Sequence, residues 1–283
     1  QLEVLNNKID LLPNKYAAYR YLANLYVNAG DIDKAVASAR RALDFNPHLY
    51  TGYIYLGNLL AQQEKLQEAA DCYQKALKIM PRNFDVHNTL GVILARQGKY
   101  NEAVNCFKHA IDFNPAFADA YANLGQALLA LKKLDESVKH LTVAVKLDSG
   151  NPLFHNYLAN VLDNSGRIDE AVKHYREAVR LKPDWNMPLN SLAWLLAVKK
   201  KSTAYNPKEA LAFAQRACNL TNNSEPALLD TLAVAYAANG QFKKAIDTAE
   251  KALDLAHSLK QDALADEIER HLNLFKAGQV YFE

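Results

Sequence analysis

Cysteine and histidine side chains recur along this sequence at one spacing, and these residue types could together bind a metal ion. With 34 residues between neighbours, the series consists of Cys72, Cys106, His140 and His174. Thiolate and imidazole are common zinc ligands, but a tetrahedral site needs every ligand about 2.0–2.3 Å from one ion. Helices in neighbouring structural units lie roughly 8–10 Å apart, so ligands spread over four units cannot converge. We therefore expect no metal site and no cofactor.

Histidines and paired carboxylates could also support acid–base catalysis. Asp135–Glu136 and Asp169–Glu170 stand at expected helix starts, where the helix dipole favours negative charge. His87 and His155 stand at spacings of 34 residues, or multiples of 34, from tyrosines elsewhere in the sequence. We therefore interpret both histidines as packing residues. The sequence contains no G-x-S-x-G, H-E-x-x-H, G-x-G-x-x-G or P-loop motif. We therefore expect no catalytic residues in this domain.

The composition is that of an ordinary soluble chain. The 283 residues include 33 Lys and Arg against 31 Asp and Glu, a net charge of +2, and 50% are hydrophobic. Nucleic-acid binders usually carry a larger basic excess, so we expect no nucleic-acid partner. No apolar run reaches about 18 residues, so we expect no direct membrane insertion by this domain. Three cysteines without a C-x-x-C motif do not indicate a disulfide framework.

The elements that carry these residues follow a 34-residue repeat. A leucine followed by a small residue recurs as Leu56–Gly57, Leu90–Gly91 and Leu124–Gly125, and Gly30, Gly98, Gly166 and Gly240 recur at expected turns. Apolar residues within each segment fall at i, i+3, i+4 and i+7, which predicts amphipathic helices. One helix pair cannot bury its apolar stripe alone, so neighbouring pairs must stack.

This pattern resembles the tetratricopeptide repeat. The segments that carry the resemblance are YANLGQALL at residues 121–129 and AVNCFKHAIDFNP at residues 103–115, with the proline that closes the repeat. Matches extend over nearly the whole chain. The resemblance implies an all-α fold, a right-handed superhelical solenoid of antiparallel helix pairs.

The 34-residue grid predicts the domain organisation. We expect seven repeats within residues 16–259, namely 16–49, 50–83, 84–117, 118–151, 152–185, 186–225 and 226–259. The sixth has a six-residue excess, since Ala193 to Ala233 is 40 residues, and most of the excess lengthens the connection before Ala210. Residues 1–12 align with the second helix of a truncated preceding repeat. Residues 260–276 are expected to form a capping helix, and residues 277–283 a loosely ordered tail.

The resemblance also implies a binding site. In this family the first helices line a concave groove that binds an extended peptide, and the matching positions of this sequence are rich in asparagine. Their side chains offer both donors and acceptors to a peptide backbone. Asparagine is also tolerated on any exposed helix face, so both interpretations stay open. The candidate peptide-binding residues are Arg20, Asn24, Asn58, Asn88, Asn123, Asn156, Asn160, Asn190 and Trp194, and Asp230 is expected on the same face.

Two details refine the expected groove. Arrays that clamp the carboxylate of chaperone tails need a second Asn and two cations where this sequence has Tyr55, Asp85 and Thr89, so that partner class is disfavoured. Trp194 with Met187 could anchor an apolar side chain of the partner, since Trp is enriched at binding hot spots. Alternatively, the long connection 199–208 folds over Trp194 and buries it.

Three functions follow from these observations. The leading hypothesis is a non-catalytic scaffold that binds a protein or extended peptide. The second starts from residues 229–283, which resemble the ends of arrays fused to bacterial membrane glycosyltransferases of the protein O-mannosylation type. That resemblance implies a domain that recruits acceptor protein, tethered to a membrane enzyme and extracytoplasmic, within a full-length enzyme. The third is self-association, because an exposed solenoid end can stack on a copy of itself. The sequence leaves open the partner's identity, the compartment, the oligomeric state, and whether the groove is free or occupied by the protein's own tail.

Overall fold

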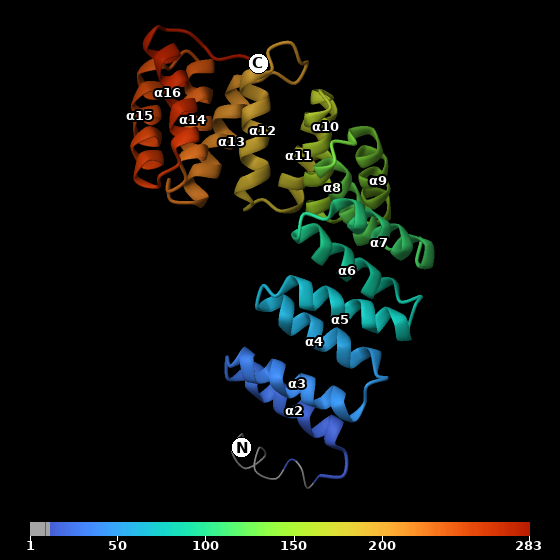
Figure 1. Ribbon diagram of the computed structural model, residues 1–283. Helices are drawn as coiled ribbons and strands as arrows, with labels where there is room; N and C mark the ends of the chain where they lie inside the picture. The colour runs from blue at the N-terminus through green and yellow to red at the C-terminus, as the bar shows by residue number, and fades with distance from the viewer. Residues whose placement is uncertain (1–8, 10–11) are drawn as a thin grey trace. The chain divides into compact units, whose positions relative to one another are not determined.

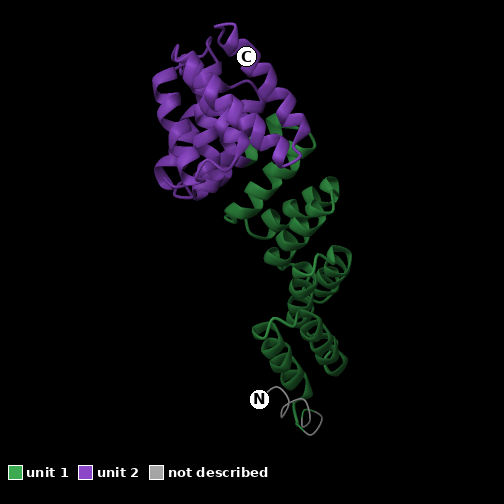
Figure 2. Cartoon of the chain, turned by 90° about the vertical axis from the view of Figure 1, so that its left-hand side faces the viewer, with its two compact units in different colours: residues 1–140 green, residues 141–283 purple. Residues whose placement is uncertain are grey.

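The chain is built from fifteen α-helices and no β-strand in the part that the structure describes, residues 9 and 12–283 of a computed structural model (Figure 1). It divides into two compact units, residues 1–140 and 141–283 (Figure 2), here called unit 1 and unit 2. The boundary falls inside one helix, α9 (Leu134–Leu147). The all-α class expected from the sequence is confirmed.

The helices follow one another as pairs of similar length. In unit 1 they are α2 (Lys15–Asn28), α3 (Ile32–Phe45), α4 (Tyr50–Gln62), α5 (Leu66–Ile79), α6 (Phe84–Arg96), α7 (Tyr100–Phe113) and α8 (Ala118–Ala130). In unit 2 they are α10 (Pro152–Asn164), α11 (Ile168–Leu181), α12 (Asn186–Val198), α13 (Pro207–Leu220), α14 (Pro226–Ala238), α15 (Phe242–Ser258) and α16 (Asp262–Lys276). Within each pair the first helix packs on the second, and the second packs on the first helix of the following pair.

Tight contact within a pair explains the small residue that follows each leucine. In α4, a Cβ atom added to Gly57 would lie 3.0 Å from the ring of Tyr73 on α5. In α6, a Cβ atom at Gly91 would lie 2.5 Å from the ring of Phe107 on α7. Both rings are fully buried. The aromatic side chain of the second helix therefore fills the space that the missing side chain of the first helix leaves.

The turn between the two helices of a pair needs a residue with positive φ. Gly98 has φ +76° there, which glycine adopts without steric cost. Glu64 and Lys132 hold the same grid position in neighbouring pairs and adopt φ 59°. The turn geometry is thus imposed by the packing of the helices and not by the glycine, since non-glycine residues are forced into it at about 1–2 kcal/mol each.

Short polar side chains mark several helix starts. Asn14, Asp31, Asn83, Asn151 and Asn206 each accept a hydrogen bond from a backbone N–H in the first turn of the following helix. Such caps satisfy N–H groups that have no partner within the helix. Asn14, Asn151 and Asn206 also precede or follow a proline, so turn and cap are encoded together.

The sequence also led to expectations for the two ends of the chain, residues 1–12 and 277–283. The helix expected in residues 1–12 falls outside the described residues, apart from Ile9 and Leu12. Part of segment 277–283, which the sequence predicts to be a loosely ordered tail, makes specific side-chain contacts in the structure. The last residues pack against α12 and α16, with Tyr281 against the rings of Trp194 and His271. The helical periodicity ends at Lys276, but aromatic residues beyond it still find partners in unit 2.

Candidate peptide-binding surface

The candidate binding residues all lie on first helices. Arg20 and Asn24 belong to α2, Asn58 to α4, Asn88 to α6 and Asn123 to α8 in unit 1. Asn156 and Asn160 belong to α10, and Asn190 and Trp194 to α12, in unit 2. We call the surface formed by these positions within each unit its first-helix face. The structure places the residues there in three different situations.

In unit 1, polar side chains of successive first helices are hydrogen-bonded to one another. The Tyr55 hydroxyl on α4 donates to Asn24 Oδ1 on α2 at 2.6 Å. The Asn123 amide on α8 donates to Asn88 Oδ1 on α6 at 3.0 Å. The Arg20 guanidinium lies 5.7 Å from the centre of the Tyr55 ring. The Tyr55 that argued against a carboxylate clamp is therefore part of this polar row.

Two of the asparagines instead support the packing of their own helix pair. The buried Tyr73 hydroxyl on α5 donates to Asn58 Oδ1 at 2.6 Å. In unit 2, Asn160 and Ser191 lie beside the hydroxyl group of the buried Tyr175 on α11. Burial raises the pKa of Tyr73 and of Tyr175 to about 12, so both phenols stay protonated and can donate. Asn58 and Asn160 remain exposed at the surface, but Asn58 uses part of its hydrogen-bonding capacity internally.

The expectation that these positions are exposed is wrong at two places in unit 2. Asn156 is only 6% exposed and Asp230 only 4%. The Asp230 carboxylate on α14 lies 3.0 Å from Nδ1 of His271 on α16, which is 2% exposed. Asn190 is half-buried, and no hydrogen-bond donor reaches its Oδ1 atom among the described residues. The added helix α16 packs on α14 and α15 and takes the place that a further repeat would occupy.

The surroundings of Trp194 bear on the alternatives that the sequence left open. Trp194 is half-buried, and the rings against it are His271 and Tyr281, each with its centre 5.8 Å away. Tyr205 of the connection 199–208 contacts Phe282. Met187 is 58% exposed and does not share this cluster. The C-terminal residues, which the sequence did not place, are the part of the chain that covers Trp194.

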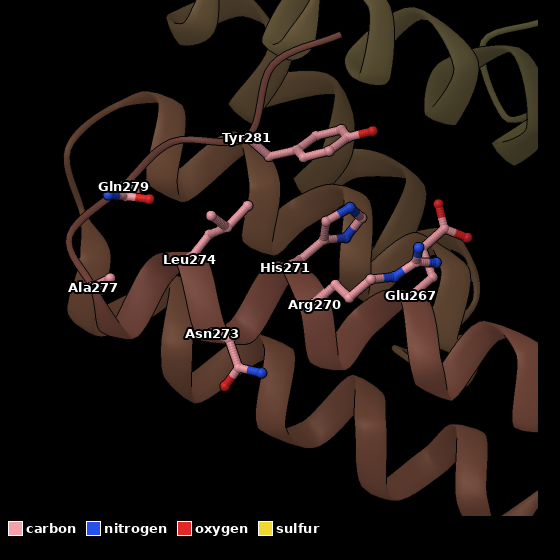
Figure 3. Close-up of a pocket in the computed structure, with 8 residues that line it drawn as sticks. All are labelled: Glu267, Arg270, His271, Asn273, Leu274, Ala277, Gln279 and Tyr281. Carbon is pink, nitrogen blue, oxygen red and sulfur yellow. The ribbon is translucent and has the colours of Figure 1, made fainter.

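A pocket of about 610 Å³ lies beside this cluster, between α16 and the returning C-terminal segment (Figure 3). It is lined by Glu267, Arg270, His271, Asn273, Leu274, Ala277, Gln279 and Tyr281. Figure 3 shows the Tyr281 ring next to the His271 ring. No motif signalled this site, because Asp230 and His271 are 41 residues apart.

The Asp230–His271 pair could polarise a nucleophile, as an Asp–His pair does in hydrolases. Among the described residues, however, no hydrogen bond joins His271 to a serine, threonine or cysteine. Trp194 and Tyr281 occupy the space around the imidazole ring. The Asp230–His271 pair therefore holds the imidazole ring against Trp194 and Tyr281.

Each residue of the histidine and cysteine series has different neighbours in its own helix pair. Nδ1 of His174 lies 3.0 Å from Nδ1 of His155, with one ring donating and the other accepting. Burial raises the pKa of the Cys106 thiol to about 11. Burial lowers the pKa of His140 and of His174. In residues 9 and 12–283, no group of three or more potential ligand side chains lies close enough to hold a metal ion.

Family models match most of the chain. Models described as TPR repeat or tetratricopeptide repeat match residues 19–49, 57–98, 93–132, 118–151, 152–185 and 228–263. No curated protein sequence gives a significant match. Among the described helices, none is long and apolar enough to cross a membrane.

Solved structures share the fold at low sequence identity. A tetratricopeptide repeat protein from Parabacteroides merdae is 17% identical over 92% of this chain and 98% of its own, with a TM-score of 0.61. PilF of Pseudomonas aeruginosa is 22% identical over 73% of this chain and 92% of its own, also with 0.61. YrrB, described as a TPR protein with an unusual peptide-binding site, is 22% identical over 68% of this chain and 98% of its own, with 0.55. The repeat spacing, the helix pairs and the matching family models together establish that this chain belongs to the tetratricopeptide repeat family.

Proposed function

We propose that the protein is a non-catalytic scaffold whose first-helix face binds an extended segment of a partner protein. The observation that carries the proposal is the polar row of unit 1, in which Tyr55 bonds to Asn24 and Asn123 to Asn88 across neighbouring helix pairs. Each of these bonds fixes an amide side chain at the surface, so less conformational freedom is lost on binding. The peptide-binding site named for YrrB is in line with such a use of the fold.

The spacing of the row suits an extended ligand. An extended chain advances about 3.3 Å per residue, and neighbouring helices lie roughly 8–10 Å apart. One helix pair therefore corresponds to about three ligand residues, so one asparagine per pair can bond the backbone without reading every side chain. Asn24 uses its oxygen for Tyr55, and no hydrogen bond from its own N–H groups is found among the described residues. Those N–H groups can donate to a partner carbonyl.

Selection from a random dodecapeptide library, followed by fluorescence anisotropy with the selected peptides, tests the proposal. The triple variant Asn24→Ala, Asn88→Ala and Asn123→Ala should weaken binding by about tenfold or more, roughly 1.4 kcal/mol. The matched control is Asn101→Ala with Asn105→Ala, two exposed asparagines on the second helix α7. Equal affinities for the triple variant and the control would refute a role of the first-helix face in unit 1.

A role in recruiting acceptor protein to a membrane glycosyltransferase is the alternative proposal. It rests on the resemblance of residues 229–283, which form α14, α15, α16 and the C-terminal segment. O-glycosylation modifies hydroxyl groups, so this function predicts that the selected peptides are enriched in Ser and Thr. Self-association through the end of the array is a third proposal, and it predicts an apparent mass that rises with concentration in sedimentation velocity.

A further inference from the structure

The C-terminal segment 279–283 returns from α16 toward the end of α12. The chain leaves α16 through Gly278, whose φ of +69° turns the backbone back along the unit. In Figure 1 the red segment runs from the end of α16 to the loop that follows α12. Its last three residues, Tyr281, Phe282 and Glu283, each meet a different group there.

Aromatic rings receive the first two residues. The Tyr281 ring lies with its centre 4.5 Å from that of His271 and 5.8 Å from that of Trp194 (Figure 3). The Phe282 ring lies 6.2 Å from Tyr205, and Lys200 Nζ lies 4.8 Å from its centre. Aromatic pairs at such distances contribute beyond their buried area, and an ammonium group over a ring adds an electrostatic attraction.

A cation receives the third residue. Glu283 Oε2 lies 2.6 Å from Lys199 Nζ, and the Glu283 N–H donates to the carbonyl oxygen of Val198 at 3.3 Å. The nearby Asp163 is partly buried, which raises the pKa of its carboxyl, while the charge of Lys199 acts in the opposite direction. One backbone hydrogen bond and one ion pair thus align the end of the segment with the end of α12.

The receiving groups are held in place without the segment. Asp230 fixes His271, which in turn contacts Trp194. The connection that carries Lys199, Lys200 and Tyr205 is tied to Asp169 on α11 by hydrogen bonds from the Ser202 hydroxyl, the Thr203 hydroxyl and the Ala204 N–H at 2.7, 2.9 and 3.2 Å. These bonds lower the pKa of Asp169. The six-residue excess of this repeat therefore builds a fixed wall of the site.

The segment itself is only partly buried. Phe282 is 39% exposed, and Glu283 is exposed as well. Few contacts suffice here because a short tether provides an effective concentration in the millimolar range. A partner segment with the same side chains and additional contacts along the first-helix face of unit 2 could replace it.

We propose that the groups around Trp194 form a docking site for a partner segment with two adjacent aromatic residues followed by an acidic one, and that residues 281–283 are its intramolecular competitor. This inference rests on the proposed function and assigns it a ligand chemistry in unit 2. The aromatic side chains of the partner would take the places of Tyr281 and Phe282, and its carboxylate would pair with Lys199.

The test uses the whole chain and a fluorescein-labelled, C-terminally amidated peptide with the sequence of residues 278–283. The variant Tyr281→Ser with Phe282→Ser should bind this peptide at least tenfold more tightly than the unchanged chain, because its own segment no longer competes. Tyr21→Ser, which replaces an exposed tyrosine of unit 1, is the matched control and should leave the affinity unchanged. Equal affinity of the double variant and the unchanged chain would overturn the proposal.

A charge exchange checks the pose. Lys199→Glu, added to the double variant, should weaken binding of the peptide, and a peptide with Lys in place of its Glu should regain it. Failure of this exchange would overturn the assigned pairing. A dimer of the unchanged chain that disappears in the double variant, measured by sedimentation velocity, would assign the segment to a second copy and overturn the competition within one chain. The library selection on unit 1 is independent of all these outcomes, so failure here and failure of the proposed function are distinguishable.

Discussion

The first-helix faces of the two units use the same repeat positions in opposite ways. In unit 1, Asn88 on α6 bonds to Asn123 of the following pair at the surface. In unit 2, the residues at the position of Asn88 are Asn156, Asn190 and Asp230; Asn156 and Asp230 are buried, and Asn190 is half-buried. Asp230 is covered because α16 brings His271 against it. A position in the repeat therefore sets which helix side a residue lies on, whereas the neighbouring elements determine whether it is available to a partner.

The largest effect that tests this difference between the two units is expected from removal of the Asp230 side chain. In Asp230→Ala, the buried His271 loses its hydrogen-bonded partner, and we expect unit 2 to lose about 3 kcal/mol of stability. Urea unfolding followed by tryptophan fluorescence measures this loss, because Trp185 and Trp194 are the two tryptophans and both lie in unit 2.

The corresponding change in unit 1 is the control. Asn88→Ala removes one neutral hydrogen bond near the surface, and we expect a cost of about 1 kcal/mol or less. Far-UV circular dichroism follows unfolding of the whole chain for both variants. Similar losses for Asp230→Ala and Asn88→Ala would contradict the view that the two positions differ in their roles.

A second experiment tests the side of first helices α4 and α6 that packs against the second helix of the same pair. In Gly91→Ala the new methyl group would lie 2.5 Å from the buried Phe107 ring, and we expect a destabilisation of about 2 kcal/mol. In Gly57→Ala the nearest atom of Tyr73 is 3.0 Å away. There the higher helix propensity of alanine, worth about 1 kcal/mol, should offset most of the cost. Urea midpoints of the two variants decide, and an equal change in both would argue against ring packing as the cause.

The smallest expected effect is the pH dependence of stability, to which buried histidines of both units contribute. Burial lowers the pKa of His87 in unit 1 and of His174 in unit 2 from the ordinary value of 6.5, and the neighbouring His155 lowers that of His174 further. The unfolded chain therefore takes up protons first. The stability that these histidines contribute is fully present above pH 6.5 and declines as the pH falls below that value.

Melting temperatures at pH 7.5 and 5.5 measure this dependence. His174→Gln should reduce the difference between the two pH values, because one of the groups with a lowered pKa is gone. His257→Gln, at an exposed histidine of the same unit, is the matched control and should leave the difference unchanged. A greater pH dependence in His174→Gln would contradict the assignment.

Much of the fold could be predicted from the sequence, but only part of the candidate site. The 34-residue repeat showed that Gly57 and Gly91 are small residues at one grid position, but the rings of Tyr73 and Phe107 that pack against them were found only in the structure. The asparagines were predicted to lie on first helices, and they do. Their hydrogen-bond partners could not be predicted, because Asn24 meets Tyr55 of the next pair whereas Asn58 meets Tyr73 of its own.

The family, the helical class and the helix side of each candidate residue could be predicted from the sequence, because they depend on local periodicity and on a register that repeats every 34 residues. The pairing of Asp230, the packing of the long connection on α11 and the contact of Tyr281 with Trp194 were found only in the folded structure. These contacts join segments 33 to 87 positions apart in the chain, and they arise where the repeat pattern ends or is interrupted. At such places the neighbours of a residue are set by the packing of the whole unit, and no local pattern records them.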